Sequence, residues 1–437
     1  MIWVGKNILN IPSRLLGMKN CIQLSLRRPF SAESLGVCGQ HPRRVGCVAS
    51  AGNPSQPYLA VHRKLKNLLD MSVTNTFVAI FCVILTMSSV ATGQNPSVTT
   101  PVMGLVTGTC KTNSDTIVSV PLMRPPECVG TISGSATLSG DFATVTASGT
   151  VSPVWAPNQF ASYYYIKFSS GALNGKVFTI AANDAKTVTF NTEGDTVGGV
   201  VDGDQFSVIK YWTIGDLFPP GVQTTFAQST SRLMPLSSLG IPNTSGTGTG
   251  GAGINLSVSR WYLIVGSGTN GKWQDTSAGD ASNQILYPDT FFIVRHNPAN
   301  FPGKAVADTT YAFLGQVNGD RVVTPLLTQA ARLQDNFVVL QRPVGVQLSD
   351  TGLSGTTGFA QSASRLMPVD TLLVYENNTP GINKSAPYTF CMVNGNWTSL
   401  SGSASNNFVI QPGMGFIIRK GAVTGGVTSF WTNNPTF

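Results

Sequence analysis

FAQSTSRLMP at residues 226–235 recurs as FAQSASRLMP at residues 359–368, and this repeat decides how the chain is organised. The two decapeptides share nine of ten residues at an offset of 133. NGKW at 270–273 likewise matches NGNW at 394–397 further along each copy. The matches indicate an internal duplication. Its expected parts are copy one at 221–296, a connector at 297–353 and copy two at 354–420.

Two copies are too few for a solenoid, which needs about three neighbouring units to bury a continuous core. We expect instead a pseudo-symmetric β-sandwich over 219–437, in which each copy contributes one sheet and the apolar faces of the two sheets pack together. In the segment FFIVRH, Phe292 and Val294 would face that shared core, while Arg295 lies on the opposite face of the strand.

Short alternating strands also dominate the preceding part of the chain. YYYIKF at 163–168 places Ile166 and Phe168 on one face, and Tyr165 on the other. KVFTI and KTVTF, at 176–180 and 186–190, are typical of a β-hairpin. The sequence therefore predicts an all-β protein. Its expected domains are an N-terminal β domain at 95–218 and the duplicated domain at 219–437.

The chain is basic only at its beginning. Its 437 residues carry 28 Lys and Arg against 20 Asp and Glu. Ten of those basic residues and two of the acidic ones lie in residues 1–70, which leaves 18 of each sign in the remainder. A body without net charge has no field to attract a phosphate backbone, so we expect no nucleic-acid partner.

An apolar segment indicates export. FVAIFCVILTM at 77–87 is followed by small residues, which is typical of the core and cleavage site of a signal peptide. We assign the signal peptide to 65–93. Eleven residues are too few for a membrane span, which needs about 20, so we expect no transmembrane helix in the mature protein.

The position of this segment, some 70 residues into the chain, leaves three explanations for what precedes it. The favoured one is a start codon placed too early, which makes 1–64 a disordered leader. An organelle-targeting segment and a small cytoplasmic domain with an internal anchor are the alternatives.

Three cysteines remain after the signal segment: Cys110, Cys128 and Cys391. In an oxidising compartment Cys110 and Cys128 could form a disulfide. The alternative is that all three are buried free thiols, because free cysteine behaves as a small hydrophobic residue.

The residue types that enzymes use are scarce. His296 is the only histidine after the signal segment, so histidine-based triads and zinc sites are nearly excluded. We expect no catalytic residue, no metal and no cofactor, and hence a protein that is not an enzyme.

Arginines and aromatic residues are the remaining candidates. Arg232 with Arg365, and Arg295 with Arg419, occupy equivalent positions of the two copies, which favours repeated structural hydrogen bonds over one active site. Aromatic side chains could instead stack on sugar rings. The candidates for stacking are Trp273, Trp397, Tyr163 and Tyr165.

Several separated blocks carry a resemblance to other proteins. SDTIVSVPLMRP at 114–125, DGDQFSVIKYWTIGDLFP at 202–219 and the paired FAQSxSRLMP blocks resemble an uncharacterised family of exported β-rich proteins of Verrucomicrobia and related bacteria. The resemblance covers about residues 105–437. It implies location and architecture, and it assigns no functional residue.

Together these features predict an exported, non-enzymatic structural or interaction protein of the periplasm, the cell envelope or the extracellular space. Its partner is unknown; an envelope polymer and self-association are the two we consider. A carbohydrate- or polymer-binding module is one alternative. An outer-membrane β-barrel is another, weakly suggested by the terminal Phe437.

Overall fold

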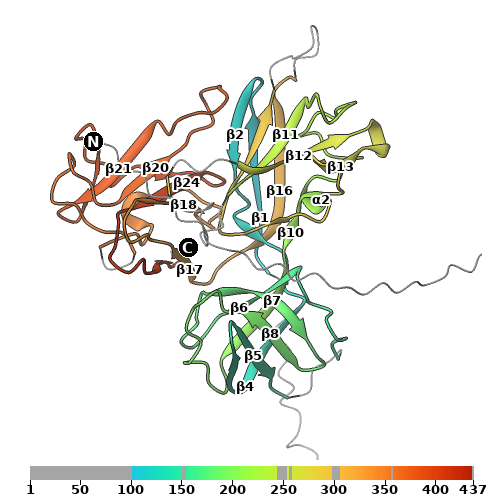
Figure 1. The fold of residues 1–437 in the computed structure, drawn as a ribbon, viewed down its shortest axis with the longest axis vertical. Coiled ribbons are helices and arrows are strands. Elements are labelled where there is room, and N and C mark those ends of the chain that lie inside the picture. The colour runs from blue at the N-terminus through green and yellow to red at the C-terminus, as the bar shows by residue number, and fades with distance from the viewer. Residues whose placement is uncertain are drawn as a thin grey trace, which may run out of the picture. The chain divides into compact units, whose positions relative to one another are not determined.

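The computed structural model describes residues 101–149, 154–243, 253–254, 258–297, 306–355 and 358–435 (Figure 1). The leader expected at 1–64 and the signal peptide expected at 65–93 lie outside these residues. The described chain is built from strands, with one four-residue helix, α2 (Ile214–Leu217), and two 3-10 turns, η1 (Gly268–Asn270) and η2 (Leu348–Asp350). The predicted all-β class is confirmed. In this part of the chain, no helix has the length and apolar character that crossing a bilayer would require.

Six strands close into a barrel in the order β4-β5-β8-β7-β6-β9, and most of them are labelled in Figure 1. They are β4 (Cys128–Ser139), β5 (Phe142–Ala147), β6 (Tyr164–Phe168), β7 (Val177–Asn183), β8 (Thr187–Asn191) and β9 (Gln205–Lys210). The alternation predicted in β6 is present, because Ile166 and Phe168 lie in the barrel core whereas Lys167 donates hydrogen bonds outward to Asn318 and Asp320. The predicted hairpin is present too, since β7 and β8 pair antiparallel.

A five-stranded antiparallel sheet, sheet one, contains the strands of copy one in the order β13-β12-β11-β15-β2. Its strands are β2 (Ser114–Val118), β11 (Ser237–Pro242), β12 (Val258–Val265), β13 (Lys272–Asp275) and β15 (Phe292–His296). β2 comes from before the barrel and pairs with β15, with Ile117 opposite Ile293.

A second five-stranded sheet, sheet two, has the order β22-β21-β20-β24-β18. Its strands are β18 (Gln334–Val339), β20 (Thr371–Val374), β21 (Tyr388–Val393), β22 (Asn396–Ser399) and β24 (Gly415–Lys420). This order matches sheet one strand for strand, with β18 in the place of β2. The two sheets therefore have the same topology.

The remaining strands extend this correspondence. They are β1 (Met103–Cys110), β3 (Leu122–Met123), β10 (Trp212–Thr213), β14 (Ile285–Leu286), β16 (Thr309–Val317), β17 (Val322–Leu326), β19 (Val346–Gln347), β23 (Val409–Ile410) and β25 (Ser429–Asn433). The antiparallel pairs β1–β16 and β10–β14 beside sheet one have counterparts in β17–β25 and β19–β23 beside sheet two. We call the two sets module one (β1–β3 with β10–β16) and module two (β17–β25).

The strand pairing differs from the expected domain grouping. We expected 95–218 to form one N-terminal β domain, but β1, β2 and β3 pair with β15 and β16 of module one. Among the described strands, only those of the barrel, from β4 to β9, form a closed sheet of their own. The barrel thus interrupts module one between β3 and β10, at a point where module two continues directly from β18 to β19.

Each module also has its own hydrophobic core, so the expectation of one core shared by the two sheets is wrong. Phe292 and Val294 lie in the core of module one, and the core of module two contains Phe416 and Ile418. The opposite faces of the two sheets meet in a smaller cluster, centred on buried residues of β2, β18 and β24 together with Phe291. Additional strands explain the difference, because β1 and β16 cover the face of sheet one that we expected sheet two to cover.

Candidate interaction site

The repeated decapeptides form two loops of the same construction, loop one (226–235) before β11 and loop two (359–368) before β20. Each loop begins with a buried phenylalanine that packs on a buried tryptophan. The ring centroids of Phe226 and Trp273 lie 5.1 Å apart, and those of Phe359 and Trp397 lie 4.8 Å apart. These contacts fix the start of each loop to the core of its module.

A buried serine then holds the two ends of each loop together. The Ser229 N–H donates to the carbonyl of Ile264 at 2.8 Å, and its hydroxyl accepts the N–H of Leu236 at 2.9 Å. Ser362 makes the equivalent pair of contacts in loop two. The serine satisfies backbone groups that the loop would otherwise leave unpaired.

The arginine of each loop donates a hydrogen bond to a backbone carbonyl. Arg232 Nη1 lies 3.4 Å from the Thr276 oxygen, and Arg365 Nη1 lies 2.8 Å from the Leu400 oxygen. Both carbonyls belong to the turn that follows the tryptophan strand. These repeated arginines thus bridge the loop to the neighbouring turn.

Between these anchors, each loop turns a leucine and a methionine to the solvent. Leu233 and Leu366 are 82% and 76% exposed, and Met234 and Met367 are 43% and 81% exposed. None of the four side chains belongs to a core cluster. Each exposed pair follows directly after the anchored arginine, so the loop presents it in a defined place.

A buried neutral network supports loop one. His296 is fully buried, and its Nδ1 and Nε2 lie 2.9 Å and 2.8 Å from the hydroxyl oxygens of Ser237 and Thr309. The Thr309 hydroxyl in turn donates to the carbonyl of Thr225. Burial lowers the pKa of His296, which favours the neutral imidazole.

An ionic network occupies the same place beneath loop two. Lys420 forms a buried ion pair with Asp370 and donates directly to the carbonyl of Gly358. The Asp370 carboxylate also accepts the N–H groups of Ala360 and Gly421. These bonds satisfy both buried charges, which is the condition for an ion pair to be tolerated inside a protein.

The second set of repeated arginines forms paired bonds to carboxylates across the sheets. Arg295 Nε and Nη2 donate to Asp115 at 2.6 and 2.8 Å. Arg419 donates to Asp335 at 2.7 and 3.0 Å. This geometry is the bidentate one that guanidinium and carboxylate groups prefer, and the bonds to Asp335 raise the pKa of Arg419. These repeated arginines thus form structural bonds whose partners are carboxylates.

The structure excludes the predicted stacking site at the repeated tryptophans. Trp273 and Trp397 are buried, and Trp273 Nε1 donates to the carbonyl of Phe218 at 2.7 Å. A buried indole has no face to offer to a sugar. Tyr165 is buried as well, so Tyr163, at 40% exposure, is the only one of the four candidates that solvent reaches substantially.

Cys110, Cys128 and Cys391 are free thiols in the structure, so the disulfide considered between Cys110 and Cys128 is not formed. Cys110 and Cys391 are buried, and Cys128 is half-buried. Burial raises the pKa of Cys110 to about 12 and that of Cys128 to about 11. Neither thiol is activated as a nucleophile would be.

Sequence reasoning missed the most exposed part of the repeat. The decapeptides themselves were evident, but the sequence did not show which of their residues are buried. The same Leu-Met pair occurs in both copies, within a loop flanked by Ser and Pro. This was the one signal in the sequence that the pair lies in an exposed loop. Among the described residues, no group of three His, Cys, Asp or Glu side chains is placed to hold a metal ion.

Comparison with known family models, with curated proteins and with solved structures gives no match to this chain.

Proposed function

We propose that this is an exported interaction protein that binds the same partner twice, through the exposed Leu-Met pairs of loops one and two. The observation that carries the proposal is the presence of one exposed apolar pair in equivalent places of both modules. Export is part of the proposal and is supported by the signal-like segment at 77–93.

The contrast between exposed and buried positions supports binding as the reason for the repeat. The two modules differ even at a buried position, where His296 in one is Lys420 in the other. They nevertheless have the same Leu-Met pair at positions outside the hydrophobic core of either module. An apolar side chain kept in solvent is explained most directly by a partner that covers it.

The chemistry of the pair indicates the kind of partner. A leucine or methionine side chain gains about 1.5–3 kcal/mol when it moves from water into an apolar pocket. Such pockets belong to protein surfaces rather than to polysaccharides, so we propose an envelope protein that presents the same pocket at least twice. Two linked contacts then strengthen binding by avidity. Because the site is duplicated, binding explains it better than a single catalytic centre would.

Photo-cross-linking in the producing cells tests this proposal. A photoreactive amino acid is placed at position 233 in one variant and at position 366 in another, and cross-linked species are identified by mass spectrometry. We expect both positions to trap the same protein. A third variant carries the probe in place of Val222, which is 78% exposed and lies outside both decapeptides. Different proteins trapped at 233 and 366, or the same products from position 222, would refute the proposal.

A further inference from the structure

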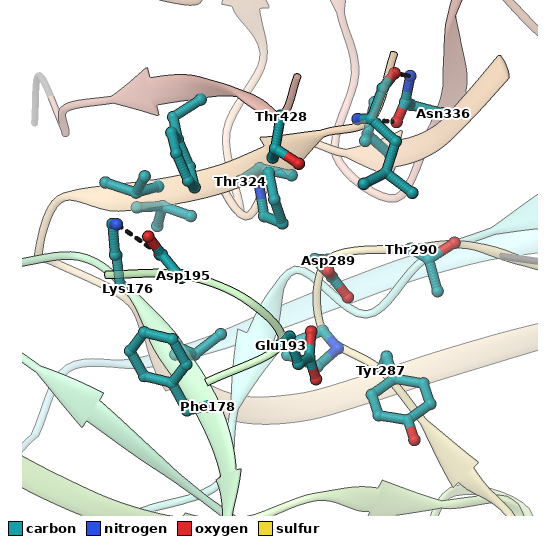
Figure 2. A pocket seen from close by; sticks show the side chains of 18 of the residues that line it. Lys176, Phe178, Glu193, Asp195, Tyr287, Asp289, Thr290, Thr324, Asn336 and Thr428 are labelled. Atoms are coloured by element: carbon teal, nitrogen blue, oxygen red, sulfur yellow. Dashed lines mark hydrogen bonds and ion pairs between the residues drawn. The ribbon is translucent and has the colours of Figure 1, made fainter. Parts of the chain in front are cut away.

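A cavity of about 830 Å³ lies where the barrel and the two modules meet (Figure 2). The barrel contributes part of β7 and the 192–196 segment that follows β8. Module one contributes the 287–290 segment between β14 and β15, and module two contributes β17, β18 and Phe430. The volume lies within the range of cavities that hold small-molecule ligands.

The charges that line this cavity do not balance. Lys176 pairs with Asp195 at 2.5 Å, and its ammonium also lies 4.3 Å from the ring centroid of Phe430. Glu193 and Asp289 lie next to each other in the cavity wall (Figure 2). Within the described part of the chain, neither of these two carboxyl groups has an ion pair or a side-chain hydrogen bond. Two acidic groups are thus left without a cation.

Aromatic and hydroxyl groups surround the two acids. The rings of Tyr211 and Tyr287 meet edge to face, with centroids 5.4 Å apart, and both tyrosines line the cavity. The Thr290 hydroxyl, next to Asp289, is buried and has no hydrogen-bond partner among the described residues. A buried polar atom of this kind generally has a partner in the functional protein.

We propose that this cavity binds a small organic cation, whose ammonium group lies between the Glu193 and Asp289 carboxylates and beside Tyr287. Acidic groups supply the charge that the ligand needs, and aromatic rings attract cations through their faces. The site is independent of loops one and two.

Backbone and electrostatic features of Glu193 agree with a binding role. Glu193 adopts a left-handed conformation with φ of 53°, and its N–H donates to the Asn191 side chain at 2.9 Å. Burial raises the pKa of both Glu193 and Asp289, and the proximity of Asp289 raises that of Glu193 further. A cation between the two carboxylates removes this repulsion and favours their ionised forms.

Calorimetric titration with n-hexylammonium chloride at pH 7 tests the proposal, with 1-hexanol as the neutral probe and calcium chloride as the metal probe. We expect the ammonium probe to bind and the other two to bind at least tenfold more weakly. Glu193→Gln and Asp289→Asn keep the size of each side chain and remove its charge, so each should weaken ammonium binding at least tenfold. Glu376→Gln changes a half-buried acid outside the cavity lining and should leave the affinity unchanged.

Thermal unfolding of each variant establishes that it is folded. If Asp289→Asn does not fold, Glu193→Gln, which lies in an exposed loop, tests the site alone. Undetectable ammonium binding, equal affinity in wild-type and both isosteric variants, or tighter binding of hexanol or calcium would overturn it.

Discussion

The Lys420 ammonium pairs with the Asp370 carboxylate at the place in module two where the His296 imidazole meets the Ser237 hydroxyl in module one. Lys420 reaches the Gly358 carbonyl directly, whereas His296 reaches the equivalent Thr225 carbonyl through Thr309. The two networks therefore connect the same strands by different chemistry. Lys420 takes the place of His296, and Asp370 takes the place of Ser237. Because both members of the pair differ, the two groups bond to each other in each module.

Lys420→Met should destabilise the protein strongly, because it leaves the Asp370 carboxylate buried without a cation. The expected loss is about 3–5 kcal/mol in the free energy of unfolding. Lys420→His combined with Asp370→Ser reproduces the His-Ser pair of module one. This double variant should lose less of the free energy of unfolding than Lys420→Met does. Urea denaturation measures both. A double variant less stable than Lys420→Met would contradict the equivalence of the two networks.

His296 should make the protein less stable as the pH falls below about 6.5. Its pKa is lowered in the folded state, so below the pKa of the unfolded state the unfolded chain binds more protons than the folded one. Stability is therefore lost on acidification, by at most about 1.4 kcal/mol per pH unit. Denaturation curves between pH 7 and pH 5 should show a shallower loss for His296→Gln. The same slope in both proteins would show that His296 does not titrate in this way.

Arg419→Met should lower the free energy of unfolding much more than Arg260→Met does. Arg419 forms the bidentate pair with Asp335, whose side chain is fully buried, and we expect a loss of about 3–5 kcal/mol. Arg260 lies 3.9 Å from Asp275 and is 59% exposed, so its removal should change stability by about 0–1 kcal/mol. Chemical denaturation of the two variants compares them directly. Equal losses would mean that the buried pair contributes no more than a surface contact.

Thiol labelling should distinguish the three cysteines by their burial. In native protein, iodoacetamide should modify Cys128 slowly and leave Cys110 and Cys391 unmodified, because burial and the raised pKa both suppress the thiolate. After unfolding without a reductant, all three should react. Peptide mapping by mass spectrometry gives the labelling at each site. A Cys110–Cys128 peptide pair that appears only without reductant would instead establish the disulfide.

Local features of this fold could be predicted from sequence, and long-range pairing could not. The alternation in β6 and the β7–β8 hairpin depend on neighbouring residues, so the pattern of apolar residues was enough. The position of β2 depends on pairing with β15, which lies some 180 residues later, as in the ion pair between Asp115 and Arg295. The barrel between β3 and β10 obscured that relationship.

The candidate sites show the same division. Repetition identified loops one and two, but the burial of Trp273 and Trp397 follows from packing that a turn sequence does not reveal. Glu193 and Asp289 come from the barrel and from module one, and their shared cavity is completed by module two. No spacing along the chain relates the two acids.

Binding of the labelled protein to the surface of producing cells that lack their own copy tests the twin-loop proposal most directly. The loop-one variant carries Leu233→Ser and Met234→Ser, the loop-two variant carries Leu366→Ser and Met367→Ser, and a third variant carries all four changes. We predict that the first two bind equally and about 10²-fold more weakly than wild type, and that the third does not bind. Val222→Ser should bind like wild type. Retention of the four-substitution variant at wild-type affinity would contradict the account.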